Sequence, residues 1–237
     1  MKKIYLYAVA LLMGVVAFSS CNDDHDQLTD SWLTHYVIFD LQGDDFVIVP
    51  IGSEYHDAGC KGTLLGEDYT SKIVTEGVED IDVNTAGLYY VTYSAENKDG
   101  YVTSITRTVA VCDPTVETDL TGKYKTQKGS TLTTGSGQTV DLKGFDVTLN
   151  RVAPGHFEIS DLLGGFYDQR AGYGPQYALT GYIQLTADNK IHVLSGQVPA
   201  WGDSFEDTVD GTYDPETGEF DFQVYYYVYW FHIILNN

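Results

Sequence analysis

The sequence predicts an all-β protein that follows a short N-terminal leader. From residue 36 onward, apolar and β-branched residues come in short runs with two-residue alternation, and Gly, Asn, Asp and Pro separate these runs. No stretch of a dozen residues keeps helical spacing. We therefore expect two consecutive β domains, divided near Pro114, where proline disfavours the continuation of a regular element.

The first 20 residues form the leader. They begin with Met1-Lys2-Lys3, continue with an apolar run over residues 4–18 and end in small residues before Cys21. The run is shorter than the roughly 20 residues of a bilayer span and has the layout of a secretory signal. It resembles the lipobox of a bacterial lipoprotein, which implies cleavage before Cys21 and a membrane anchor through lipid on its sulfur. Residues 21–35 are polar and acidic, and we expect a flexible acidic tether there.

The formal net charge of the chain is −21, with 34 acidic against 13 basic residues. Such a chain repels phosphate backbones, so nucleic-acid binding is excluded. With lipid on Cys21, Cys60 and Cys112 remain as a pair in an oxidising compartment, and we expect a disulfide between them. The alternative is two buried free thiols, because cysteine often serves as a small core residue.

The first β domain is expected over residues 36–113. Asn97-Lys98-Asp99-Gly100 indicates a hairpin between its last two strands, because glycine tolerates the positive φ of tight turns. Several short strands with turns at close intervals favour a small β-sandwich. The expected strands are 36–41, 46–51, 69–74, 87–95 and 102–111.

The same region carries a resemblance to the immunoglobulin-like domains found as modules in bacterial surface proteins. The segments that carry it are 52–59 (GSEYHDAG), 85–93 (TAGLYYVTY), 99–101 (DGY) and 106–111 (TRTVAV). The resemblance implies an immunoglobulin-like β-sandwich that acts as a spacer or a docking surface. The stretch contains no tryptophan, so the Cys–Trp–Cys signature of antibody domains is absent.

The second β domain is expected over residues 114–237. Turns are indicated at 187–190 (ADNK) and 214–218 (DPETG). Aromatic residues in both alternation phases of 225–231 suit a hairpin or a strand buried on both faces, and we assign most of them to the core. A second β-sandwich and a β-barrel both remain open. The expected strands are 122–128, 138–151, 155–159, 178–186, 190–198, 205–213 and 219–235.

The order of an acidic lipoprotein start, an immunoglobulin-like module and a Tyr-rich β domain resembles surface lipoproteins of gut Bacteroidetes. These often accompany the transporter and glycan-binding pairs of polysaccharide-utilisation systems. The resemblance implies a lipid anchor in the outer membrane, facing the cell exterior, and a non-catalytic accessory role in glycan uptake. An alternative from another class is a structural or adhesive protein that binds an outer-membrane transporter complex.

Two loops of the second domain have the composition of a carbohydrate site. Residues 164–177 are rich in glycine and alternate aromatic rings with amide and charged groups, and 199–203 place a tryptophan in a turn. Sugars present apolar C–H faces with hydroxyl edges, so flat rings beside carboxylates or guanidinium groups suit them, and long loops in compact domains are commonly functional. The structural alternative is that the rings pack a sheet edge. The candidate ligand-binding residues are Tyr167, Asp168, Arg170, Tyr173, Tyr177, Trp201 and Asp203.

The sequence contains no catalytic motif of a metalloprotease, serine hydrolase, thiol oxidoreductase or nucleotide-binding protein. The six histidines are isolated, so we expect no metal and no cofactor. A glycan hydrolase is the least favoured alternative, because two carboxylates at catalytic separation arise by chance in so acidic a chain. The carboxylates considered for it are Glu158, Asp161, Asp168, Asp203, Glu206, Asp207 and Asp210.

Overall fold

The computed structural model describes residues 33–237. The predicted signal 1–20, the lipidation site Cys21 and most of the tether 21–35 lie outside the described residues. The regular secondary structure of the described part consists almost entirely of strands, which confirms the all-β class. Within it, no helix is both long and apolar enough to cross a bilayer.

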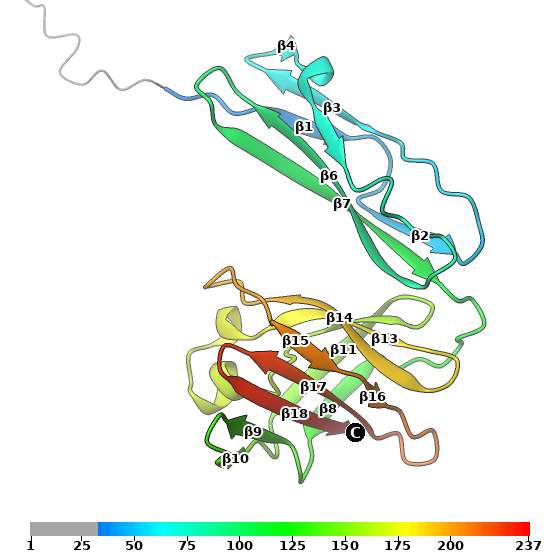
Figure 1. Cartoon of the computed structure of the whole chain (residues 1–237), viewed down its shortest axis with the longest axis vertical. Coiled ribbons are helices and arrows are strands. Elements are labelled where there is room, and N and C mark those ends of the chain that lie inside the picture. The colour runs from blue at the N-terminus through cyan, green and yellow to red at the C-terminus, as the bar shows by residue number, and fades with distance from the viewer. Residues whose placement is uncertain (1–32) are drawn as a thin grey trace, which may run out of the picture. The chain divides into compact units, whose positions relative to one another are not determined.

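The first domain is an immunoglobulin-like sandwich of two sheets (Figure 1). One sheet has the order β1-β3-β4, from β1 (Ile38–Leu41), β3 (Cys60–Leu64) and β4 (Glu67–Asp68). The other has the order β2-β7-β6-β5, from β2 (Phe46–Pro50), β5 (Val74–Glu76), β6 (Gly87–Glu96) and β7 (Val102–Cys112). The strands β2 and β7 run parallel and the other pairs are antiparallel.

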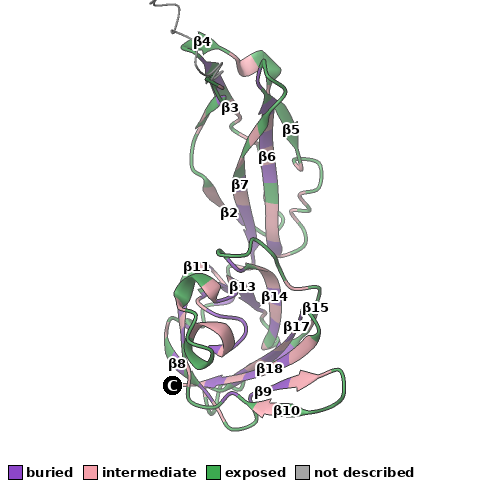
Figure 2. Ribbon diagram, turned by 90° about the vertical axis from the view of Figure 1, so that its left-hand side faces the viewer, coloured by how far each residue is buried: buried purple, intermediate pink, exposed green. Residues whose placement is uncertain are grey.

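The longest hairpin joins β6 to β7 and turns at the predicted position. The Asn97 side-chain oxygen accepts hydrogen bonds from the backbone N–H groups of Asp99 (3.0 Å) and Tyr101 (2.8 Å). On β6 the buried residues alternate at Val91, Tyr93 and Ala95 (Figure 2), as a strand with one face on a core requires.

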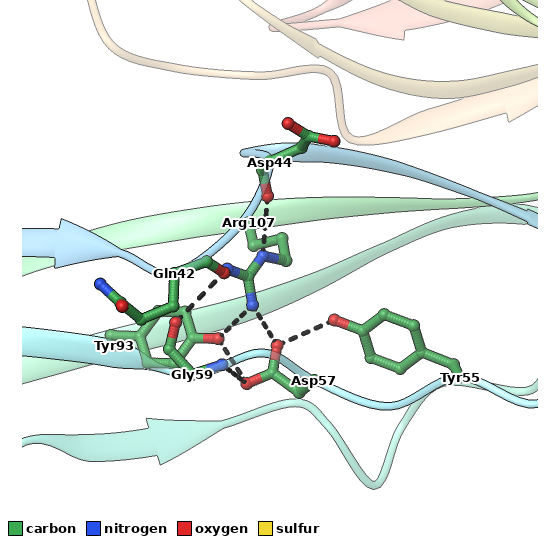
Figure 3. A network of polar contacts seen from close by, with 7 residues as sticks. All are labelled: Gln42, Asp44, Tyr55, Asp57, Gly59, Tyr93 and Arg107. Carbon is green, nitrogen blue, oxygen red and sulfur yellow. Dashed lines mark hydrogen bonds and ion pairs between the residues drawn. The ribbon is translucent and has the colours of Figure 1, made fainter.

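A buried arginine joins segments of this sandwich that are far apart in the sequence (Figure 3). The Arg107 side chain lies on β7, is 1% exposed and forms an ion pair with Asp57. It also donates to the Tyr93 hydroxyl (2.7 Å) and to the backbone carbonyls of Gln42 (2.5 Å), Asp44 (2.9 Å) and Gly59 (3.4 Å). Two segments without regular structure are thereby held against the sheet.

The disulfide predicted between Cys60 and Cys112 is wrong, because both cysteines are free. Cys60 begins β3 opposite Leu41, and its thiol donates to the backbone carbonyl of Lys61 at 3.3 Å. Cys112 ends β7 beside Pro50 and is buried. Burial raises the pKa of both thiols. Each cysteine therefore serves as a small packing residue, which was the alternative interpretation.

The strand predicted over 69–74 is also wrong. Its centre forms a short 3₁₀ turn, η1 (Thr70–Lys72), and the strand β5 begins only at Val74. The Asp68 carboxylate accepts a hydrogen bond from the Thr70 backbone N–H at 2.9 Å, and this local bond favours a turn over a strand.

The second domain is a single curled sheet that resembles a half-barrel. Its main path has the order β10-β9-β18-β8-β11-β12-β13-β14-β16, and β17 pairs with both β15 and β18. The strands are β8 (Gly122–Thr126), β9 (Thr131–Thr134), β10 (Thr139–Asp141), β11 (Asp146–Ala153), β12 (His156–Ile159), β13 (Thr180–Leu185), β14 (Lys190–Gln197), β15 (Asp207–Val209), β16 (Gly211–Thr212), β17 (Phe220–Tyr226) and β18 (Tyr229–Asn236).

Because the sheet is curled, the last strand of the path, β16, lies against β17. A bridge joins Tyr213 to Phe220, and the Asp221 carboxylate accepts a hydrogen bond from the Thr212 backbone N–H at 3.0 Å. A Cβ atom at Gly211 would lie 1.6 Å from the Asp221 carbonyl oxygen, so this close approach requires glycine. The open choice between sandwich and barrel is resolved in favour of the curled sheet.

The concave interior holds the core of this domain. On β17, Phe220, Phe222, Val224 and Tyr226 are buried, and β18 adds the alternating set Phe231, Ile233 and Leu235 (Figure 2). The segment predicted as 219–235 is the hairpin of β17 and β18. The turn at 227–228 changes the alternation phase, so that Tyr226 and Phe231 both face this interior. The assignment of most of these rings to the core is wrong, because the other rings of 225–231 are half-buried or, for Tyr227, 68% exposed.

Candidate functional site

The structure brings four of the predicted ring residues together. Tyr167, Tyr173 and Tyr177 come from the loop between β12 and β13, whereas Trp201 comes from the turn after β14. The Trp201 ring centroid lies 5.0 Å from that of Tyr167, 5.0 Å from that of Tyr177 and 6.5 Å from that of Tyr173. We call these four residues the aromatic cluster.

The aromatic cluster has an anchored side and an open side. Tyr167 is half-buried and contacts Phe166 (4.7 Å between centroids) and Tyr226 (6.0 Å) of the core. Tyr173 and Trp201 are 54% and 45% exposed. The open rings therefore rest on a packed base, which limits the rotamer entropy that a ligand would have to remove.

Local backbone geometry shapes the loop. Gly164 (φ 59°) and Gly165 (φ 81°) adopt left-handed conformations directly before η2 (Phe166–Arg170). This turn is π-helical, as the Arg170 N–H donates to the Gly165 carbonyl (2.8 Å) and the Ala171 N–H to the Phe166 carbonyl (2.9 Å). Isolated π-helical turns are frequent at functional sites. A short 3₁₀ turn, η3 (Pro175–Tyr177), ends the loop.

A buried carboxylate closes the base of the loop. The Asp161 side chain accepts hydrogen bonds from the backbone N–H groups of Leu163 (2.8 Å), Gly165 (2.9 Å) and Leu179 (3.3 Å), which lie near both loop ends. Burial raises the pKa of Asp161 to about 7, although these three donors oppose the rise by stabilising the carboxylate. Asp161 therefore positions the loop from below.

Two further contacts hold the loop at its sides. The Gln169 side-chain amide forms two hydrogen bonds with the backbone of Asp146, accepting from its N–H (2.9 Å) and donating to its carbonyl (2.8 Å). The Ala200 N–H donates to the Gln176 carbonyl at 2.9 Å. This last bond connects the Trp201 turn directly to the loop.

The predicted polar residues have different positions. Both Asp203 carboxylate oxygens accept from the buried Tyr226 hydroxyl at 3.0 Å, so Asp203 also fixes the Trp201 turn to β17. Asp168 is half-buried and Arg170 exposed, both on η2, and neither side chain forms an ion pair with another described residue. Asp168 and Arg170 therefore remain available to a ligand.

Several of the carboxylates considered for hydrolysis have internal partners. Asp161 is fully enclosed and bonded to backbone, and Asp210 lies 2.7 Å from His192. Among residues 33–237, no group of three His, Cys, Asp or Glu side chains is arranged to hold a metal ion.

Sequence reasoning found the rings but not the residues that support them. It placed Asp161 among the hydrolytic candidates, and it missed Gln169 and Tyr226. The signal for Asp161 was its position directly before an apolar pair and two glycines, where an Asp side chain readily bonds the backbone of a turn.

The comparisons with known proteins cover both domains. A family model of the Ig-like domain of bacterial surface proteins matches residues 39–111, and a family model of a C-terminal domain matches residues 113–237, more than half of the chain. No curated protein matches the chain significantly.

Solved structures that are similar to the chain include the following two. The lipoprotein BT2262 from Bacteroides thetaiotaomicron is 37% identical over 85% of this chain and 100% of its own, with a TM-score of 0.49. The structure of CBM51-2 in complex with GlcNAc and INT domains of ZmpB from Clostridium perfringens is 16% identical over 52% of this chain and 29% of its own, with a TM-score of 0.27, and carries no argument. By sequence identity and by the C-terminal domain model, the chain belongs to the family of Bacteroides lipoproteins that includes BT2262.

Proposed function

We propose that this protein is a non-catalytic surface lipoprotein that binds carbohydrate through the aromatic cluster, as an accessory of polysaccharide uptake. The observation that carries the proposal is the meeting of Tyr167, Tyr173, Tyr177 and Trp201 from two separate segments. Two of these rings remain about half exposed, although burying both would be favourable in a simple core.

The polar surroundings of the aromatic cluster support the same proposal. Asp168 and Arg170 supply an acceptor and a donor on η2, in the same loop as three of the rings, and sugar hydroxyls can bond to both kinds of group. The proposal of a non-catalytic role is supported by Asp161 and Asp203, whose carboxylates are engaged in holding the loop and the turn.

In this proposal the immunoglobulin-like domain is a spacer. Lipid on Cys21 anchors the protein in the outer membrane, and the curled-sheet domain faces the cell exterior. The similarity to a Bacteroides lipoprotein and to a surface-protein domain supports this location.

The test is a glycan array probed with the mature chain without lipid, residues 22–237. Trp201→Ala and Tyr173→Ala are each expected to weaken binding at least about tenfold, which corresponds to ~1.4 kcal/mol. Tyr101→Ala is the matched control, because Tyr101 is also 54% exposed but lies in the immunoglobulin-like domain.

Two outcomes would contradict the proposal. One is the absence of binding to plant, host and microbial glycans, and the other is binding that both cluster substitutions leave unchanged. Co-purification with an outer-membrane transporter that survives both substitutions would instead favour the protein-interaction alternative.

A further inference from the structure

The relative orientation of the exposed rings restricts what the aromatic cluster can hold. The planes of Tyr173 and Trp201 meet at 86°, with 6.5 Å between centroids. Tyr177 is also steeply inclined to both, at 70° to Tyr173 and 65° to Trp201. Only Tyr167 is nearly parallel to Tyr173, at 23°, and it is the half-buried ring on the anchored side of the cluster.

Flat polysaccharide surfaces and extended chains are bound by rings that lie in one plane and are spaced along the ligand, so that successive sugars stack in the same way. The two exposed rings of the aromatic cluster, Tyr173 and Trp201, instead lie edge to face and are nearly perpendicular. A sugar that stacks on the exposed face of Tyr173 or Trp201 would contact the other of these two rings at its side. The geometry therefore provides one stacking position, bounded on one side.

The charges around this position are mostly negative. Burial first, and then Asp203 and Glu206, raise the pKa of Tyr226, and burial and then neighbouring groups that include Asp203 raise the pKa of Tyr167. Asp168 and Arg170, which have opposite charges, both lie on η2. In a chain of net charge −21, this surrounding disfavours a polyanionic ligand.

We infer that the aromatic cluster holds a single neutral sugar residue, at a chain end or a branch, and does not bind along a glycan chain or on a crystalline polysaccharide face. This inference rests on the proposed carbohydrate-binding function and narrows its ligand class. Trp201 and Tyr173 bound the stacking position, and Asp168 and Arg170 of the same loop region are the side chains proposed to bond the sugar hydroxyls.

The test is a titration series with defined oligosaccharides. The mature chain, residues 22–237, is titrated with cello-, xylo-, manno- and chito-oligosaccharides of one to six residues, and with oligogalacturonates of the same lengths as the anionic comparison. In parallel it is sedimented with insoluble cellulose and chitin. Trp201→Ala and the control Tyr101→Ala are measured alongside.

We expect at least one neutral series to bind with a Kd that changes less than about twofold from two to six residues, because a linear chain presents the same ends whatever its length. Oligogalacturonates and the insoluble polymers are expected not to bind. Tightening of tenfold or more with length, binding of oligogalacturonates, or Trp201-dependent retention on an insoluble polymer would overturn the inference while leaving the carbohydrate function intact. Binding to no carbohydrate in any assay would overturn the proposed function itself, and the inference with it.

Discussion

Arg107 shows how one buried side chain can hold segments without regular structure against a sheet. All five of its N–H groups have acceptors, and Asp57 neutralises its charge. Asp57 in turn accepts from the hydroxyls of Tyr55 (2.8 Å) and Tyr93 (2.5 Å). The GSEYHDAG and TRTVAV segments of the sequence are thus the two halves of one network.

Replacing Arg107 with methionine is expected to destabilise the immunoglobulin-like domain strongly. The substitution leaves Asp57 without its counter-charge and several carbonyls without donors, so the free energy of unfolding should fall by about 3–5 kcal/mol. Chemical denaturation measures the loss. The control is Lys125→Met, since the Lys125–Asp146 pair is well exposed and such pairs contribute little. Equal stability of the Arg107 variant and the wild type would show that the network has no net stabilising effect.

Asp161 is expected to make the stability of the curled-sheet domain depend on pH. Its pKa of about 7 in the folded protein is above the ordinary value, so the folded state binds the proton more tightly than the unfolded state does. This contribution is present in full below pH ~4 and is lost as pH rises through about 7. Asp161→Asn should flatten that decline and also lower stability, because one of its oxygens is replaced by an amide that faces an N–H donor.

Urea denaturation of the wild type and Asp161→Asn at pH 4.5, 6 and 7.5 measures both effects. Glu216→Gln serves as the control, because Glu216 is exposed and forms no ion pair with another described residue. An identical pH profile for Asp161→Asn and the wild type would contradict the titration of Asp161 in this range.

Among the elements, the loop between β12 and β13 depends on Gly165, which no other residue replaces well. Gly165 has φ 81°, and an added Cβ would lie 2.6 Å from Phe145 Cβ. Gly165→Ala is therefore expected to reduce stability by more than about 1 kcal/mol and to weaken carbohydrate binding, because the loop must shift. Gly172→Ala is the matched control: its φ of 72° imposes similar backbone strain, but nothing lies within 4 Å of the new atom. Equal thermal shifts for both variants would rule out the packing contribution.

The strands were predicted from alternation where one face packs on a core, as in β6, β7, β13 and β14. The prediction missed β3, β4 and β9, because Cys60–Leu64 contains lysine and glycine, Glu67–Asp68 consists of two acidic residues and Thr131–Thr134 is mostly threonine. It also merged β10 with β11 and β15 with β16. Short strands that are separated by brief turns look like one continuous strand in the sequence.

Of the candidate site, the sequence predicted the ring residues but not the residues that support them. Ring residues in Gly-rich loops are visible in the sequence, and the structure places Trp201 against Tyr167 and Tyr177. The supporting bonds of Asp161 and Gln169 are long-range or depend on backbone direction, and no spacing rule encodes them. For the same reason the pairing of Cys60 with Cys112 was wrong: an even number of cysteines does not establish that two thiols face each other.

For the whole molecule, the predicted leader and the acidic composition both bear on the proposed location. A net charge of −21 keeps the folded part soluble and repels anionic surfaces, so membrane attachment has to come from a specific anchor. The proposed anchor is lipid on Cys21, and acyl chains contribute about 0.8 kcal/mol for each buried CH₂ group. The folded domains then need no apolar surface of their own for attachment.

Cys21→Ser is therefore expected to abolish metabolic labelling with palmitate and to move the protein from the membrane fraction to the soluble fraction. Cys60→Ser is the matched control, because Cys60 packs against the sandwich core and carries no lipid in this proposal. Protease added to intact cells should remove the wild-type curled-sheet domain, since an outward-facing anchor exposes it. Retention of Cys21→Ser in the membrane would contradict the lipid anchor. Protection of the wild type from protease, with the label retained, would keep the anchor and place the protein on the inner side of the outer membrane.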